Sequence, residues 1–234
     1  MMKKTFETIS KSILFNGLPP DHVEKIAGIV VERFFGKGEF IFSEGDAGIG
    51  FFLVKEGLVK IFKVSLDGKE QILHIFGPGE PFGEVPVFSG EDFPASAEAI
   101  DETKVLFFPR SAFVKLIHNH PSLALNMLAV LSMRLRQFTV QVENLSLKEV
   151  PARLAAYLMY LSEEHDTPDS VTLKISKGQL ASLLGTIPET LSRIFQKMTA
   201  QRLIQVEGRH IRLLDSTGLK ALSIQGTAFN QAPE

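Results

Sequence analysis

Three polar side chains near the C-terminus are spaced so that they could read the edges of DNA bases. Glu189, Ser192 and Arg193 lie three and four residues apart, which places them on one face of a helix that begins near Pro188. Arginine can donate two hydrogen bonds to guanine O6 and N7, glutamate can accept one from cytosine N4, and serine can adapt to either role. The alternative is an exposed Glu–Arg pair, which is common on helices and adds little stability.

Basic residues surround this segment. Between residues 174 and 220 the chain has eight Lys or Arg residues and three Asp or Glu residues, although its formal net charge is −2. A local excess of positive charge favours a nucleic-acid surface. We expect Lys177, Lys197 and Arg209 to hold phosphates, which adds affinity without sequence preference, and we place Ser176 beside them on the DNA-binding surface.

The rest of the chain shows no arrangement typical of catalysis. It has no nucleophile beside a base, no paired carboxylates and no metal-binding cluster, and Gly77-Pro78-Gly79 lacks the Gly-Lys-Ser/Thr of a phosphate-binding loop. The sequence contains no cysteine, which excludes disulfides, thiol chemistry and cysteine-ligated iron–sulfur clusters. We therefore expect no catalytic residue and no metal site, and a protein that is not an enzyme.

A long amphipathic helix is predicted between residues 121 and 147. Apolar residues at the a and d positions of a heptad repeat define a dimer seam: Leu128, Leu131, Leu135, Phe138, Val142 and Leu145. A second apolar row, at Leu123, Met127 and Val130, could pack on the same chain. The pattern is typical of a helix that pairs with a second copy, and a single core helix is the alternative.

Short apolar runs separated by glycine precede this helix. They occupy residues 40–42, 50–54, 58–64, 71–76 and 105–108. Asp67-Gly68 between two of these runs is a strong hairpin signal. Many short strands with regular turns predict a small antiparallel barrel or sandwich, and the mixture with helices gives the class α+β.

The segment after Pro151 predicts a winged helix-turn-helix. The spacing of Ser176 and Gln179 is that of a capping box, Gly185 ends the short helix that follows, and Pro188 suits the first position of the next. Residues 201–215 predict a strand, a turn and a strand. Two short helices joined by a tight turn and followed by a hairpin are typical of DNA-binding domains.

These patterns divide the chain into four parts. They are a β-rich domain at residues 1–120, a dimerisation helix at 121–147, a DNA-binding domain at 148–225 and a flexible polar tail at 226–234. The sequence predicts neither a signal peptide nor a membrane span. We therefore expect a cytoplasmic protein that does not bind a membrane.

Several motifs in this order resemble the CRP/FNR family of bacterial transcription regulators over nearly the whole chain. They lie at residues 38–45, 54–60, 67–70, 77–84 and 185–194. The resemblance implies an N-terminal double-stranded β-roll that senses a small molecule or gas, a long dimerisation helix and a C-terminal winged helix-turn-helix. It also implies a homodimer that binds a palindromic promoter site in double-stranded DNA and acts with RNA polymerase.

Two departures from the family pattern bear on the signal. Cyclic-AMP-binding members have an Arg-Ser or Arg-Thr pair downstream of a Gly-Glu motif, whereas here Gly83-Glu84 is followed by Pro94 and Ala95 at the corresponding positions. That arginine holds the cyclic phosphate through two parallel hydrogen bonds, so we expect that cyclic AMP is not the effector. The absence of cysteine excludes the iron–sulfur cluster of FNR itself.

The remaining pattern is similar to the DNR and HcpR branch of the family. The shared residues are 123–125, 131–132, 134–135, 145–148 and 188–190. That branch is associated with nitric oxide or redox sensing, in some members through haem, which implies nitrosative-stress or anaerobic respiratory control. Residues 189–193 resemble the recognition helix of FNR and imply a TTGAT-like half-site. The alternatives are another effector, such as a cyclic nucleotide or an aromatic molecule, or a module that does not bind DNA.

The predicted effector pocket lies between the β-rich domain and the long helix. Its residues would be His74, Phe76, Phe82, Gly83, Glu84, Val85, Phe88, Met127 and Leu131. An apolar pocket suits haem or an aromatic ligand, and a neutral imidazole at His74 could ligate haem iron. The alternative is that these residues are core, with Glu84 a structural residue at a strand end.

Overall fold

The computed structural model describes residues 2–16, 18–164, 167 and 169–225, so the predicted tail at 226–234 lies outside the described residues. The chain forms two compact units, Met1–Arg136 and Gln137–Glu234. The division falls within the helix α5 (Ser122–Leu147). The last turns of α5 therefore belong to the same unit as the helices that follow it.

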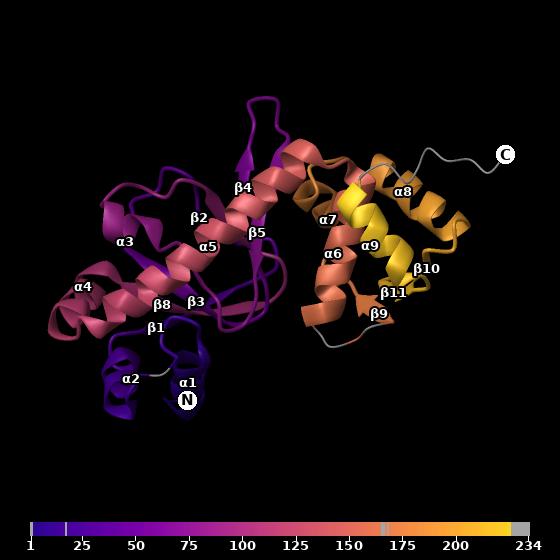
Figure 1. Ribbon diagram of the computed structural model, residues 1–234. Helices are drawn as coiled ribbons and strands as arrows, with labels where there is room; N and C mark the ends of the chain where they lie inside the picture. Colours follow the sequence, from indigo (N-terminus) through magenta and orange to yellow (C-terminus); the bar gives the residue numbers. More distant parts are fainter. Residues whose placement is uncertain (1, 17, 165–166, 168, 226–234) are drawn as a thin grey trace. The chain divides into compact units, whose positions relative to one another are not determined.

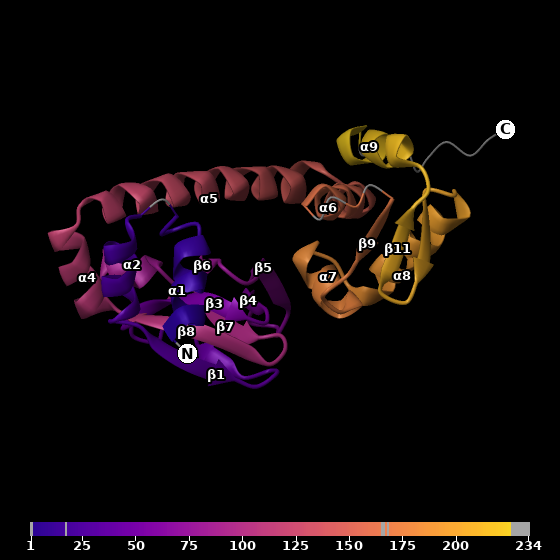
Figure 2. The same cartoon turned by 90° about the horizontal axis from the view of Figure 1, so that it is seen from below.

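The first unit contains two four-stranded antiparallel sheets within its described residues (Figures 1 and 2). The strands are β1 (Val31–Phe35), β2 (Phe40–Phe42), β3 (Gly50–Glu56), β4 (Val59–Val64), β5 (Glu70–Phe76), β6 (Pro81–Phe82), β7 (Ser96–Ala99) and β8 (Thr103–Pro109). One sheet has the order β1-β8-β3-β6 and the other β2-β7-β4-β5. This arrangement confirms the predicted antiparallel β-roll of an α+β protein.

Phenylalanine fills the space between the two sheets. The cluster contains six phenylalanines, none more than 8% exposed: Phe42, Phe52, Phe76, Phe82, Phe93 and Phe107. The rings of Phe42 and Phe93 stack with their centroids 3.7 Å apart. Alternation along the strands sends five of these side chains inward, and Phe93 reaches the same space from the segment between α3 and β7. The interior of the roll is therefore occupied by its own aromatic side chains.

Helices close the first unit and form a second apolar cluster against β3 and β8. They are α1 (Met2–Lys11), α2 (Pro20–Ala27), α3 (Val85–Ser89), α4 (Arg110–Asn119) and the start of α5. The rings of Phe51 and Phe108 stack at 4.5 Å, and Phe113 of α4 meets Phe51 edge-on at 4.7 Å. Figure 2 shows α1, α2 and α4 beside the β1–β8 sheet.

The second unit combines helices with a small antiparallel sheet of order β10-β11-β9. Its elements after α5 are α6 (Val150–Glu164), β9 (Ser170–Thr172), α7 (Lys177–Leu183), α8 (Pro188–Ala200), β10 (Ile204–Glu207), β11 (His210–Leu213) and α9 (Ser216–Gln225). Helices α6 and α9 pack together (Figure 1). Among the helices that the structure describes, none is both long and apolar enough to cross a membrane.

The motifs predicted for the helix-turn-helix are confirmed in detail. Ser176 Oγ accepts a hydrogen bond from Gln179 N at 3.2 Å, and the Gln179 side chain accepts one from Ser176 N at 2.9 Å, so both halves of the capping box form. Gly185 has φ 66°, which permits the turn, and Pro188 begins α8. This local geometry fixes where the face of α8 points within its own domain.

Candidate nucleic-acid interface and effector site

The exposed face of α8 carries the three side chains predicted to read DNA. Glu189, Ser192 and Arg193 are all exposed, while Leu191 and other apolar residues of the opposite face are buried in the domain. Ser192 Oγ donates a hydrogen bond to the Pro188 carbonyl at 2.8 Å. Because its one hydrogen is used in this way, the hydroxyl can act toward a ligand as a hydrogen-bond acceptor. The helix thus presents a forked donor and two acceptors on one surface, which is the chemistry that base edges require.

An open groove of about 570 Å³ runs beside this face. It is lined by residues of α7, α8 and β10: Lys177, Ser192, Phe195, Gln196, Thr199, Ala200 and Val206. Lys177 Nζ lies 5.5 Å from the centroid of the Phe195 ring, which holds the ammonium group at the groove. Sequence reasoning missed Gln196, although its spacing of three from Arg193 and four from Ser192 puts it on the same helix face.

The other predicted DNA-binding residues belong to the same unit. Lys197 on α8 and Arg209 in the turn between β10 and β11 are exposed. Ser176 is also exposed, but its hydroxyl caps α7. Its contribution to a phosphate would therefore compete with helix capping.

The predicted dimer seam is an exposed apolar row on α5. The exposed fractions are 59% for Leu128, 69% for Leu135, 46% for Phe138 and 62% for Val142. Leu131 and Leu145 are half-buried. Exposed large apolar side chains in a row mark a surface for protein contact, and within one chain this row is not part of a core.

Arg134 on α5 makes three contacts with the roll. Its guanidinium pairs with the Glu84 carboxylate, donates to the Pro81 carbonyl and lies 5.0 Å from the centroid of the Phe76 ring. The side chains of Arg134 and Glu84 are only 16% and 11% exposed. Partial burial strengthens the attraction between the two charges, so the pair ties α5 to the end of β6.

His74 lies on β5 next to this ion pair. Its ring centroid is 4.5 Å from that of Phe76. Burial, reinforced by the positive charge of Arg134, lowers the pKa of His74 from 6.5 to about 4. The imidazole is therefore neutral at pH 7, and one ring nitrogen carries a lone pair that can ligate a metal ion.

Apolar packing occupies the place where a cyclic-phosphate fork would stand. Phe93 stacks on Phe42, and Ala95 is 6% exposed. The Pro94 carbonyl accepts a hydrogen bond from Lys63 Nζ at 3.0 Å. Gly83 has φ 70°, and a Cβ there would lie 3.1 Å from the Phe42 ring, so a residue with a side chain would be strained at this turn. Neither a guanidinium nor a hydroxyl is supplied at positions 94 and 95.

The residues predicted to line the effector pocket differ in their exposure. Val85 and Phe88, on the short helix α3, are each 48% exposed. Phe82 is fully buried in the aromatic core. Leu131 is half-buried on α5, and the side chain of Met127 lies outside the described residues.

Sequence reasoning missed Arg134, which is the ion-pair partner of Glu84. In the sequence, Arg134 belongs to the residues shared with the DNR and HcpR branch, but it was assigned no role at the effector site. The two residues are 50 positions apart, and no local pattern predicts a contact over that separation. The structure thus places Arg134, which was not predicted, beside three predicted residues, His74, Phe76 and Glu84.

Comparisons with known proteins agree with this two-part architecture. Residues 32–120 match the cyclic nucleotide-binding domain, and residues 152–222 match the Crp-like helix-turn-helix domain. A protein of Thermus thermophilus named cyclic AMP receptor protein is 34% identical over 209 residues, which are 87% of this chain and 95% of that protein. The chain belongs to the CRP/FNR family of transcription regulators.

Other CRP/FNR proteins are similar over most of their length. The transcriptional activator protein FnrA of Stutzerimonas stutzeri is 31% identical over 194 residues, which are 80% of this chain and 78% of that protein. The structure of FixK2 from Bradyrhizobium japonicum matches with a TM-score of 0.74 and 27% identity, over 83% of this chain and 97% of that chain. These relatives are regulators of transcription, not enzymes, and the helix-turn-helix of this CRP/FNR protein is a DNA-binding domain.

Proposed function

We propose that this CRP/FNR protein is a dimeric, effector-responsive regulator that binds a palindromic promoter site through α8 and acts on RNA polymerase there. The observation that carries the proposal is the combination of a base-reading face at Glu189, Ser192 and Arg193 with an exposed apolar seam on α5. A two-fold dimer presents two copies of α8, which suits an inverted repeat in DNA. The resemblance of residues 189–193 to FNR makes a TTGAT-like half-site the first sequence to test.

The effector would act at the group formed by His74, Glu84 and Arg134. Arg134 lies directly before the seam residue Leu135 on α5. A ligand that takes over the contacts of Arg134 with Glu84 would change how this part of α5 is held. Such a ligand can shift the regulator between two states only by binding one of them more tightly than the other.

Haem is the effector-binding group that we propose, with nitric oxide or redox state as the signal. The donor chemistry fits, since His74 is neutral and half-buried, and Arg134 beside it could pair with a haem propionate. Phenylalanine side chains pack in the interior of the roll, so we place the ring on the side of His74 and Arg134. When bound, haem iron supplies a centre that binds diatomic gases.

Absorption spectroscopy tests the haem proposal. Titrating haem into the wild-type protein should give a sharp Soret band with saturable, one-to-one stoichiometry. In His74→Gln the Soret maximum should shift relative to wild type, because an iron ligand is removed. In His118→Gln, which changes a histidine at an exposed helix end, the maximum should stay where it is in wild type. A broad band that is the same in all three proteins would contradict haem binding at this site.

An aromatic small molecule is the second candidate effector. The observation in its favour is that Arg134 lies over the Phe76 ring and can stack on or donate to a planar ligand with acceptor groups. Calorimetry with such compounds on wild type and Arg134→Ala distinguishes it from haem, because this ligand would bind in the His74→Gln protein. Equal heats in wild type and Arg134→Ala would contradict binding at Arg134.

A further inference from the structure

The guanidinium group of Arg153, on α6, bonds to the ends of two other helices of the second unit. Its Nη2 donates to the Leu145 carbonyl at 3.0 Å and its Nε to the Lys148 carbonyl at 2.8 Å. Its Nη1 donates to the Leu184 carbonyl at 2.7 Å. The first two carbonyls are at the C-terminal end of α5, and the third is at the C-terminal end of α7.

The chemistry of these contacts explains why an arginine stands here. The last four carbonyls of a helix have no partner within the helix, so the ends of α5 and α7 both need external donors. A positive charge is also favourable at a helix C-terminus. Guanidinium offers five N–H donors in a fixed plane, whereas a lysine ammonium is a single point and cannot reach three carbonyls at the ends of two helices equally well.

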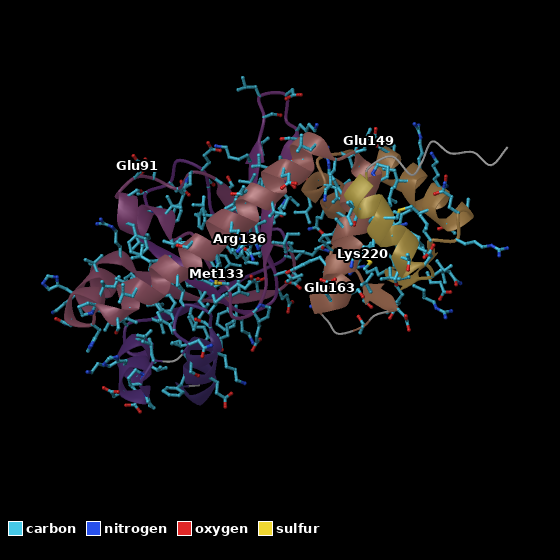
Figure 3. All side chains as sticks on the ribbon, in the orientation of Figure 1. Glu91, Met133, Arg136, Glu149, Glu163 and Lys220 are labelled. Carbon is cyan, nitrogen blue, oxygen red and sulfur yellow. The ribbon has the colours of Figure 1, made fainter. Side chains whose placement is uncertain are left out.

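The three hydrogen bonds form a short path from the dimer seam to the DNA-reading helix. Leu145 is the last seam residue, and Leu184 precedes Gly185, the turn that leads to Pro188 at the start of α8. All of these residues belong to the same compact unit, Gln137–Glu234. Arg153 is itself anchored in the first turn of α6, where its N–H donates to the Glu149 carbonyl at 3.1 Å (Glu149 is labelled in Figure 3).

We infer that Arg153 is a positioning residue that sets which spacing between DNA half-sites the dimer accepts. In a two-fold dimer, the distance between the two copies of α8 depends on how rigidly each is held to its own seam, and half-site spacing follows from that distance. Arg153 holds the end of α7, from which the turn at Gly185 leads to α8, to the end of α5. Its loss should therefore make the distance between the two copies of α8 more variable without altering the base-reading side chains. This inference rests on the proposed dimeric binding to DNA.

The test measures spacing preference, which a general loss of stability does not change. The probes are duplexes with an inverted repeat of the TTGAT-like half-site, with the best spacer for wild type and with spacers one base pair shorter and longer. If the wild-type protein binds none of these duplexes, the TTGAT-like repeat is replaced by the inverted repeat that the protein selects from a pool of random duplexes. The proteins are wild type, Arg153→Ala, Arg153→Lys and a control, Lys220→Ala, which removes an exposed cation on α9 (Figure 3).

Wild type and Lys220→Ala should show the same preference for one spacer. Arg153→Ala should lower that preference, measured as the ratio of Kd values between spacers, by about tenfold, which corresponds to one or two net hydrogen bonds. Arg153→Lys should fall between them, and it serves as the main variant where Arg153→Ala folds poorly. Fractions of folded protein are measured in parallel by circular dichroism.

Two results would overturn the inference. An equal rise in Kd on all spacers for the Arg153 variants would show that the residue only stabilises the domain. An unchanged spacer preference would show that α8 is positioned by other contacts. If the wild-type protein binds no duplex even after selection, the proposed function itself is contradicted. The inference about Arg153 then fails because it depends on DNA binding, which is a different result from the two above.

Discussion

Arg134 on α5 pairs with Glu84 at the end of the roll, across 50 residues of sequence. Because Arg134 precedes the seam residue Leu135, the same stretch of helix faces the roll through one side chain and solvent through the next. A ligand that reaches Glu84 must either displace Arg134 or bind to it. In the proposed regulator, this pair is where an effector bound to the roll would influence the association of two chains.

Breaking the Arg134–Glu84 pair should destabilise the first unit. We expect Glu84→Gln or Arg134→Ala alone to lower the free energy of unfolding by about 1–3 kcal/mol, because each leaves a partly buried group without its partner. Chemical denaturation measures the loss. The double variant should lose less than the sum of the single variants, and a strictly additive loss would show that the two side chains are not coupled.

The stability of the first unit should fall as the pH falls below the ordinary pKa of histidine. Since the folded pKa of His74 is about 4 and the usual value is 6.5, the unfolded chain binds a proton in this range that the folded chain does not. The free energy of unfolding should therefore decrease from about pH 6.5 to about pH 4, by up to roughly 3 kcal/mol for this residue. Urea denaturation at several pH values measures the decrease.

Two variants give this pH prediction its controls. His74→Gln should remove the decrease that His74 causes, because glutamine does not titrate. His210→Gln, in the second unit, should leave the pH dependence of the first unit as it is in wild type. The prediction fails if wild type and His74→Gln lose stability in parallel over the whole range.

A charge in the apolar row of α5 should prevent dimerisation. Leu135→Glu would bury an unpaired carboxylate at the seam, which is strongly unfavourable. Sedimentation velocity should then show monomers, and binding to the inverted repeat should be lost. Gln137→Glu introduces the same residue at an exposed position outside the heptad seam and should leave the dimer intact. A dimeric Leu135→Glu protein would place the seam elsewhere.

Arg193 and Lys197 should differ in how they contribute to DNA binding. We expect Arg193→Ala to cost about 1–3 kcal/mol on the specific site and little on random DNA, because a base contact is lost. Lys197→Ala should weaken binding to the specific site and to random DNA by a similar amount, because a phosphate contact is lost. It should also reduce the dependence of the affinity on salt concentration. Fluorescence anisotropy at several salt concentrations measures both. Equal losses for Arg193→Ala on the two kinds of DNA would make Arg193 a phosphate contact.

Cyclic AMP should not bind with measurable affinity. The positions that would supply a guanidinium and a hydroxyl hold Pro94 and Ala95, and Phe93 packs into the aromatic core. Isothermal titration calorimetry should show no saturable heat for this chain. The Thermus thermophilus relative named cyclic AMP receptor protein is the positive control under the same conditions. Micromolar affinity in this chain would show that another group holds the phosphate.

The sequence by itself determined the elements whose signals are local. The capping box at Ser176 and Gln179, the glycine turn and Pro188 lie close together in the chain, and each acts on the backbone within a few residues of itself. The heptad row likewise follows from helix geometry alone, so its exposure on α5 matches the predicted seam. The winged helix-turn-helix and the antiparallel strands could therefore be predicted without any knowledge of the tertiary contacts.

Only the tertiary structure decided the chemistry of the two connections along α5. Arg134 meets Glu84, His74 becomes neutral beside them, and Arg153 reaches the carbonyl of Leu184, because folding brings together segments that are remote in sequence. Hydrogen bonds and charges act over a few ångströms in space, and no propensity or periodicity records which remote residues will come within that distance. For the same reason Val85 and Phe88 resembled pocket residues in the sequence but are half-exposed in the fold.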